Sequence, residues 1–436
     1  MLRKKTDPKI SAFVVTGITL ILVPGIMAKE GWDDHDRSGR YTAIAMAKNY
    51  LNSCAPDAIL FTNGDNDTFP LWYAQEVEGI RTDVRVVNLS LLNTEWYIEQ
   101  MKRKAYESEP VPFSLPWDQY KDGTRNFTYF IENENIKGHV ELAELFKIMR
   151  ENPDRLSMQT RFGPVEYFPT KKVKITIDSA QVVETGTVSP GQAHRIVEEI
   201  KWALKGSGIG KNHLMVLDLI AHNNWKRPVY FAITTGSSSY VGLEDYFQIE
   251  GLTYRLVPVK TVRRDALIGD TRTDVMYNNL MSKYDFGNME DTDIYLDETN
   301  VRMAMNLRNN FSRLSEALAD EGRADSARQV IERCMEKLPD ERLPFNYFAL
   351  TFAESYYKIG DFDKGNEVFQ KLINNMEEQL DFYFRFTGDR AKAYDVDKQQ
   401  NMAILNRIRQ VAQRHEQNEV KEKAKQVFDR FYSMFR

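Results

Sequence analysis

Cysteine is scarce in this 436-residue sequence, which contains only Cys54 and Cys334. These two residues fall in what we predict to be different domains, which excludes a disulfide framework and a zinc site built from thiolates. The scarcity of cysteine does not fix the compartment, because an exported protein needs no disulfide.

Concentrated positive charge and the common catalytic motifs are also missing. The formal net charge is −5, so the chain offers no strongly basic face and we expect no nucleic-acid partner. Gly-x-Ser-x-Gly, His-Glu-x-x-His and P-loop motifs do not occur, and the six histidines show no metal-ligand spacing. We therefore predict neither a cofactor nor a histidine-based metal site, and the candidate chemistry rests on two acidic stretches.

One long apolar segment is present near the N-terminus. Residues 10–28, ISAFVVTGITLILVPGIMA, carry no charge and at about 1.5 Å per residue nearly cross a hydrocarbon core of about 30 Å. Basic residues precede the segment (Arg3, Lys4, Lys5, Lys9), and mostly acidic ones follow it (Lys29, Glu30, Asp33, Asp34, Asp36). The positive-inside rule then predicts a single-pass protein of a bacterial inner membrane, with everything after Lys29 in the periplasm.

A cleaved signal peptide is the alternative for this segment. The apolar core of a signal peptide usually spans about 7–15 residues and ends at a small-x-small site. Here the core is longer, and Ile26-Met27-Ala28 has a bulky residue where a small one is expected. These features favour an uncleaved membrane helix, although both interpretations export the rest of the chain.

The next part of the chain alternates between helical and strand patterns. Apolar residues have helical spacing at 41–53, 69–79 and 94–106. Between these segments, buried strands are expected at 58–64 and 83–92. This order predicts parallel strands joined by crossover helices, a Rossmann-like α/β domain. We expect it to span 30–270, with a Pro-rich and aromatic insertion at 108–205 that holds a strand at 171–178. Its later elements are a helix at 212–225 and strands at 227–234 and 252–259.

After a linker at 271–299, the part from 300 to 436 has helical patterns that repeat. Segments 314–339 and 352–373 align through a glycine, a small residue five positions later and a large apolar residue four beyond that (Gly322, Ala327, Ile331; Gly360, Gly365, Phe369). The pattern resembles the tetratricopeptide repeat, whose period is about 34 residues, with a short insertion at 340–345. A weaker third copy is expected through Ala412, Ala424 and Phe428. A generic bundle of helical hairpins remains the alternative. The predicted fold is thus α/β followed by all-α, preceded by a stub and transmembrane helix at 1–29.

The first acidic stretch, GWDDHDRSGRY at 31–41, directly follows the apolar segment. Aspartates are ligands for hard cations such as a divalent metal, and Arg37 and Arg40 suit a phosphate or carboxylate. The alternative is that Asp36 or Ser38 caps a helix beginning near Arg40, while the other charges are solvated or paired.

The second acidic stretch, GDNDT at 64–68, directly follows the first predicted strand. Ligands of open α/β sheets bind beyond the carboxyl ends of strands, so Asp65, Asn66 and Asp67 are candidate binding residues, with Trp72 and Tyr73 as a stacking wall. Asp67 or Thr68 as the N-cap of the following helix, with Pro70 in its first turn, is the structural alternative. Both interpretations are open at this point.

Three stretches resemble a known family: WDDHDRSGRYTA (32–43), the segment from Leu60 to Leu92, and WYIEQMKRKAY (96–106). They look like the C-terminal part of a Bacteroidota membrane protein family of unknown function. That family is related to transmembrane protein O-mannosyltransferases with tetratricopeptide repeats. Such proteins are similar to GT-C glycosyltransferases, which have many membrane helices, a polyprenyl-phosphate sugar donor and a catalytic acid in the first external loop. By this resemblance the present chain is a fragment or split remnant without the catalytic acid, whose partner is an upstream multi-helix membrane part.

Three functional hypotheses follow. The first is an accessory portion of a glycosyltransferase that transfers a lipid-linked sugar to protein, binding the acceptor polypeptide, the polyprenyl-linked sugar or both. The second is a membrane-anchored scaffold for envelope proteins. The third is a metal-dependent hydrolase that uses Asp33, Asp36, Asp65 and Asp67. Nucleotide-sugar chemistry at Asp65 and Asp67 is opposed by the expected export, because nucleotide sugars are scarce outside the cytoplasm.

Overall fold

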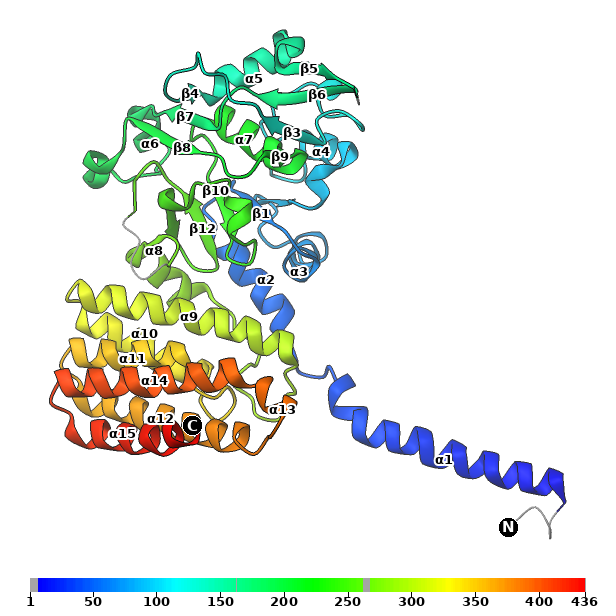
Figure 1. Cartoon of the computed structure of the whole chain (residues 1–436), viewed down its shortest axis with the longest axis vertical. Coiled ribbons are helices and arrows are strands. Elements are labelled where there is room, and N and C mark those ends of the chain that lie inside the picture. The colour runs from blue at the N-terminus through cyan, green and yellow to red at the C-terminus, as the bar shows by residue number, and fades with distance from the viewer. Residues whose placement is uncertain (1–6, 162, 262–266, 436) are drawn as a thin grey trace.

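A single long helix projects from an otherwise compact body in the computed structural model, which describes residues 7–161, 163–261 and 267–435 (Figure 1). This helix, α1 (Pro8–His35), starts with Asp7, whose carboxylate accepts a hydrogen bond from the Lys9 amide at 2.8 Å. Its part Pro8–Trp32 is long and apolar enough to cross a membrane and is not buried against the body. The expected apolar helix is therefore present, and it is consistent with a single-pass membrane protein. Its orientation stays a prediction, since Arg3, Lys4 and Lys5 lie outside the described residues.

A six-stranded mixed sheet forms the centre of the body, in the order β13-β11-β12-β10-β1-β2. Its strands are β1 (Ile59–Thr62), β2 (Arg85–Asn88), β10 (Val229–Ala232), β11 (Phe247–Ile249), β12 (Thr253–Leu256) and β13 (Asp270–Thr271). β10, β1 and β2 are parallel, as expected, whereas β12 is antiparallel to both β10 and β11. No crossover helix separates β11 from β12. A tight turn through Gly251 (φ 134°) joins them, and strands joined in this way must run antiparallel.

Both faces of this sheet are covered. Helices α2 (Thr42–Asn52) and α3 (Asp65–Glu76) pack on the face that carries Leu60. Helix α7 (Lys211–Asn223) packs on the opposite face with Ile59 and Phe61, together with α4 (Glu95–Met101) and α5 (Leu142–Glu151). Every residue of β1, β2 and β10 is buried, which explains why β1 and β10 show apolar runs rather than alternation.

The insertion adds two smaller sheets and covers the α7 side. One has the order β5-β6-β3-β9 and the other β4-β7-β8. The predicted strand at 171–178 is confirmed as β7 (Lys172–Thr176). The remaining elements are β3 (Phe127–Phe130), β4 (Val140–Glu141), β5 (Ser157–Thr160), β6 (Gly163–Phe168), α6 (Ser179–Glu184), the 3₁₀ turn η5 (Pro190–Arg195), β8 (Glu199–Ala203) and β9 (Gly208–Gly210).

The C-terminal part is helical, as predicted, and contains three antiparallel hairpins, α9/α10, α11/α12 and α14/α15 (Figure 1). Each hairpin turns through a residue with positive φ: Gly322 (73°), Gly360 (83°) and Glu416 (58°). The same hydrogen bond closes each turn, joining an amide to the carbonyl five residues earlier at 2.8–2.9 Å. The helices are α8 (Thr273–Asn278), α9 (Glu298–Asp320), α10 (Ala324–Lys337), α11 (Tyr347–Lys358), α12 (Phe362–Tyr383), α13 (Asp389–Lys392), α14 (Asp395–Arg414) and α15 (Asn418–Tyr432).

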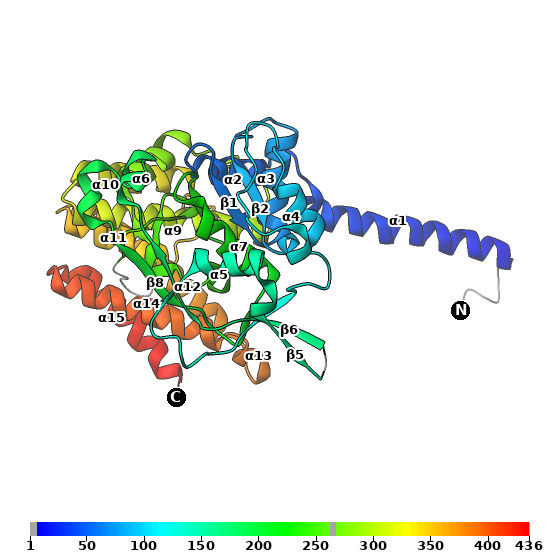
Figure 2. The same cartoon turned by 90° about the horizontal axis from the view of Figure 1, so that it is seen from above.

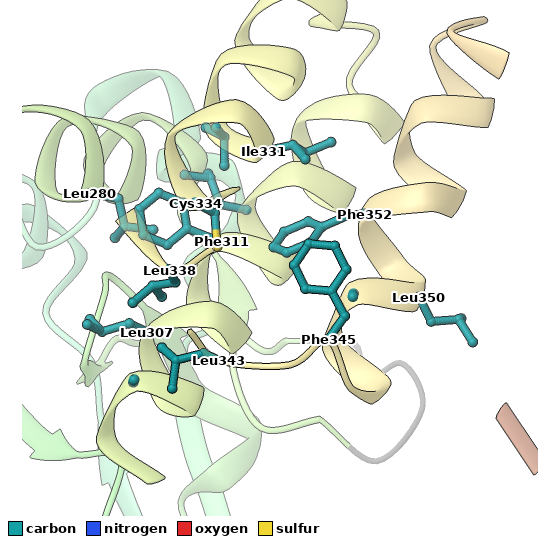
Figure 3. Packing of buried hydrophobic residues seen from close by; sticks show 14 of the residues in the cluster. Leu280, Leu307, Phe311, Ile331, Cys334, Leu338, Leu343, Phe345, Leu350 and Phe352 are labelled. Carbon is teal, nitrogen blue, oxygen red and sulfur yellow. The ribbon is translucent and has the colours of Figure 1, made fainter. Parts of the chain in front are cut away.

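The hydrophobic core is continuous from the sheet into the hairpins. The predicted linker, 271–299, contributes Met276, Leu280 and Met289, all fully buried in this core. Leu280, just after α8, lies beside Phe311 of α9 and Cys334 of α10 in Figure 3. The helical part is therefore packed against the α/β part rather than joined to it by a loose tether.

Candidate functional site

The candidate stretch after β1 forms the first turn of α3, with Gly64 as the N-cap residue. Asp67 Oδ1 accepts a hydrogen bond from the Gly64 amide at 3.0 Å, and Asp67 Oδ2 accepts one from the Thr234 hydroxyl at 2.7 Å. Only 8% of Asp67 is exposed. Asp67 thus caps the helix through its side chain, although the N-cap itself is Gly64 and not Asp67 or Thr68. Its Oδ2 joins α3 to Thr234, which lies two residues after the end of β10.

Thr68 lies beside Asp67 and is fully buried. Its hydroxyl is 2.8 Å from the Thr62 hydroxyl and accepts a hydrogen bond from Asn88 Nδ2 at 2.9 Å. These contacts tie the start of α3 to the last residues of β1 and β2. Together, Asp67 and Thr68 fix the position of the helix N-terminus relative to three parallel strands.

Asp65 and Asn66, by contrast, are exposed. They lie at the carboxyl ends of β1 and β10, where the chain leaves these two neighbouring strands toward opposite faces of the sheet. Open α/β sheets bind ligands at this position. Other polar residues meet them there from the loops after β1, β2 and β10, and Ser90 Oγ donates to the Asn63 carbonyl at 2.9 Å. We call this group the strand-end surface; it comprises Asn63, Asp65, Asn66, Ser90, Thr234 and Ser237.

The aromatic residues predicted as a stacking wall lie further along α3. Trp72 and Tyr73 follow Asp65 by seven and eight residues, about 10–12 Å along the helix axis. Trp72 is half-buried and its ring centroid lies 5.6 Å from that of Phe69. Tyr73 is exposed and donates to Glu78 Oε1 at 2.8 Å, a hydrogen bond that raises the pKa of the phenol. The structure therefore does not bring these two rings beside Asp65.

Phe69 is the aromatic residue that the sequence reasoning missed. It lies one turn after Asp65 on the same face of α3, and 53% of it is exposed. The predicted helical spacing began at residue 69, whereas α3 begins at Asp65. With the correct start, the i, i+4 spacing of Asp65 and Phe69 would have identified a polar and an aromatic residue side by side.

The first acidic stretch begins in the last turn of α1, and its residues 36–41 form the connection to the body. Asp36 Oδ1 accepts hydrogen bonds from the amide (2.8 Å) and hydroxyl (2.5 Å) of Ser38, which lower the pKa of the carboxyl. Arg37 is exposed on this connection. The capping interpretation was wrong here, because α2 begins at Thr42 after Tyr41, without a side-chain cap.

Arg40 anchors the same connection to the helical part. Its guanidinium lies 3.3 Å from Asp297 Oδ2, and only 9% of its side chain is exposed. Asp297 is also the N-cap of α9, where it accepts a hydrogen bond from the Asn300 amide. The exit of α1 is therefore fixed at the start of α9, and α1 leaves the body on the side where α3 lies (Figures 1 and 2).

The predicted residues thus occupy two separate places: Asp36, Arg37 and Arg40 lie on the α1 connection, and Asp65–Tyr73 lie on α3. Within the described part of the chain, no group of three or more His, Cys, Asp or Glu side chains is placed to hold a metal ion. The side chains of Asp33 and Asp34 lie outside the described residues. The metal-dependent hydrolase stays an untested prediction.

A comparison with protein families gives one match. The family model described as TMEM260-associated domain 2 matches residues 43–276, more than half of the chain. The matched part begins in α2 and ends in α8, so it contains the six-stranded sheet, the insertion and the strand-end surface, but not α1 or the three hairpins. No solved structure matches the chain.

Proposed function

The chain belongs to the TMEM260-associated domain 2 family, and from this we propose that it is the extracytoplasmic, acceptor-binding portion of a membrane glycosyltransferase-like protein. TMEM260 itself is a predicted protein O-mannosyltransferase. In this proposal the reaction transfers a polyprenyl-linked sugar to a protein hydroxyl. The base that activates the hydroxyl belongs to a multi-helix membrane part, and the present chain contributes recognition.

The observation that carries this proposal is the exposure of Asp65, Asn66 and Phe69 on one turn of α3 at the strand-end surface. Carbohydrates offer hydroxyl groups, which hydrogen-bond to carboxylates and amides, and apolar ring faces, which pack on aromatic side chains. Asp67 and Thr68 hold this turn rigidly, so the exposed groups need little reordering when a sugar binds.

The position of α3 supports the same assignment. A polyprenyl carrier keeps its sugar at the bilayer surface, so residues that contact the sugar must lie on the side of the body that faces the membrane. Helices α1 and α3 lie on the same side, and Arg40 fixes the exit of α1 (Figures 1 and 2). We place this side at the periplasmic surface of a bacterial inner membrane.

In this proposal the three hairpins act as tetratricopeptide-like repeats that hold the acceptor polypeptide. The glycine turns at Gly322 and Gly360 support a repeat, and so does Gly365, where an added Cβ would lie 2.5 Å from the Tyr357 ring. Such close approach between the helices of a pair requires a residue without a side chain.

The test is sugar transfer to an acceptor protein in membranes that contain the complete transfer system. We expect Asp65→Ala, Asn66→Ala and Phe69→Ala each to lower the initial rate about tenfold, the effect of losing roughly 1.4 kcal/mol of binding in the transition state. Glu144→Ala is the matched control, because Glu144 is an exposed acidic residue in the first turn of another helix, α5, outside the hairpins.

Unchanged transfer in all three variants would overturn the proposal. The scaffold hypothesis predicts that outcome, together with loss of function when charges on the hairpins are reversed. Circular dichroism of each variant separates loss of recognition from loss of fold.

A further inference from the structure

A cavity of about 480 Å³ lies at the opposite edge of the six-stranded sheet from the strand-end surface. Its lining comes from β11 and β13, from η5 of the insertion and from the C-terminal half of α9. β13 is four strands from β1, so the cavity is roughly 19 Å across the sheet from β1. It is therefore separate from the site proposed for the sugar.

The backbone of β13 has a second edge, which pairs with no other strand among the described residues and borders this cavity. In the parallel ladder with β11, the Arg272 amide donates to the Ile249 carbonyl at 3.2 Å. Because alternate residues of a parallel strand bond to the same neighbour, Thr271 directs its N–H and C=O away from β11. The Thr271 amide makes a local hydrogen bond to the Asp270 carboxylate, and its carbonyl has no partner among the described residues. Thr271 also lines the cavity.

Two side chains in the cavity lack partners as well. Gln248 Oε1 is buried and accepts no hydrogen bond from any described residue. The Arg272 guanidinium makes no ion pair or hydrogen bond within the described part of the chain. A buried acceptor without a donor costs about 1–3 kcal/mol, which a ligand with an N–H group would offset.

The acidic side chains of the lining are paired with cations, which argues against a cationic ligand. Glu316 and Asp320 pair with Lys358, and Asp274 and Glu321 pair with Arg323. Asp270 lies 3.8 Å from Arg195 across the cavity. No aromatic ring is among the lining residues, so the stacking that usually orients a sugar is missing. The matching ligand is neutral and supplies both donors and acceptors along its length.

We propose that this cavity binds an extended segment of polypeptide that pairs with β13 as an added edge strand. Its backbone N–H and C=O groups would pair with the Thr271 carbonyl and amide, while its side chains would meet Gln248 Oε1 and Arg272. The lining is mainly polar, which selects small hydroxyl-bearing side chains over large apolar ones. This inference rests on the proposed function, in which the segment belongs to the acceptor, and it follows the strand-addition mode of peptide recognition.

The experiment compares Thr271→Pro with Thr271→Val in the full chain, reconstituted in nanodiscs, with a fluorescent Ser- and Thr-rich peptide as the probe. Proline removes the outward amide of an edge strand, whereas valine keeps it and removes only the hydroxyl. We expect the Kd of the peptide to rise at least tenfold for Thr271→Pro and less than twofold for Thr271→Val. Ala317→Trp, which fills the cavity from α9, should also raise the Kd of the peptide at least tenfold.

Equal affinity of the Thr271→Pro and wild-type proteins would overturn the inference. So would displacement of the peptide by a mannose oligosaccharide, which would make the cavity a sugar site. The result is independent of sugar transfer: peptide binding that requires the Thr271 amide stands even if the Asp65 variants transfer sugar normally. Conversely, sugar transfer could depend on Asp65 while peptide binding is unaffected by Thr271→Pro. That result would overturn the inference about the cavity and leave the proposed function standing.

Discussion

At the scale of single residues, Asp65 and Asp67 show how two aspartates on one helical turn differ. Asp67 satisfies the Gly64 amide and the Thr234 hydroxyl, whereas Asp65 is exposed. We expect Asp67→Ala to lower the free energy of unfolding by about 1–3 kcal/mol, because it removes a helix-capping acceptor and leaves two donors without a partner. Asp65→Ala should change it by less than about 0.5 kcal/mol. Urea titration of both variants checks this, and equal midpoints would contradict it.

The sequence pattern indicated where this site lies, but not which of its residues hold the helix in place and which are exposed. The position of GDNDT directly after a buried strand can be read from neighbouring residues. So can the three-residue spacing between Gly64 and Asp67, which lets the acidic side chain cap the helix. The partner of Asp67, Thr234, lies 167 positions later, and nothing near Asp67 in the sequence indicates it. Phe69 was missed because a one-turn error in a helix start changes which side chains share a face.

At the scale of elements, one buried arginine holds the irregular segment between the first and second hairpins. Arg308 of α9 donates to the carbonyls of Leu338 (3.0 Å), Leu343 (2.6 Å) and Pro344 (3.0 Å). We expect Arg308→Met to lower the free energy of unfolding by at least about 3 kcal/mol, since three carbonyls lose their donor. Arg308→Lys should recover only part of this loss, because an ammonium group cannot reproduce the planar fork.

Thermal unfolding followed by circular dichroism measures both variants. Arg302→Met on the exposed side of α9 is the control, since among the described residues Arg302 forms only an exposed ion pair, with Glu298. An Arg308→Met melting temperature equal to that of the control would contradict the prediction.

The same segment shows what the sequence could reveal about elements. Two glycines 38 residues apart predicted two hairpins and an insertion near 340–345, and the hairpins are present. The role of Arg308 was not visible, because a charged residue in an amphipathic helix normally indicates a solvated position. The small sheets of the insertion were largely missed for a related reason. Their strands are short and half-exposed, so they lack the continuous apolar pattern that identified β1 and β10.

At the scale of the whole molecule, one core joins the sheet to the hairpins through Met276 and Leu280. In the proposed arrangement, the side of the body that faces the membrane is set by α1, whose exit is held by the ion pair between Arg40 and Asp297. Sequence alone predicted the apolar helix from its length and composition. It could not predict this anchoring, because the two partners are separated by most of the α/β part.

The last prediction concerns which side of the membrane the body occupies, and the two native cysteines make it measurable. Cys54 and Cys334 are buried, and burial raises the pKa of Cys334 to about 12 and that of Cys54 further, so neither thiol reacts readily in the folded protein. Asp363 is exposed in the first turn of α12. A membrane-impermeant maleimide applied to spheroplasts should therefore label Asp363→Cys without lysis. It should label Lys9→Cys only after lysis, because Lys9 lies at the N-terminal end of the span, directly before the uncharged segment 10–28. The reverse pattern would place the strand-end surface in the cytoplasm, where the sugar donor would be a soluble nucleotide sugar and not a polyprenyl carrier.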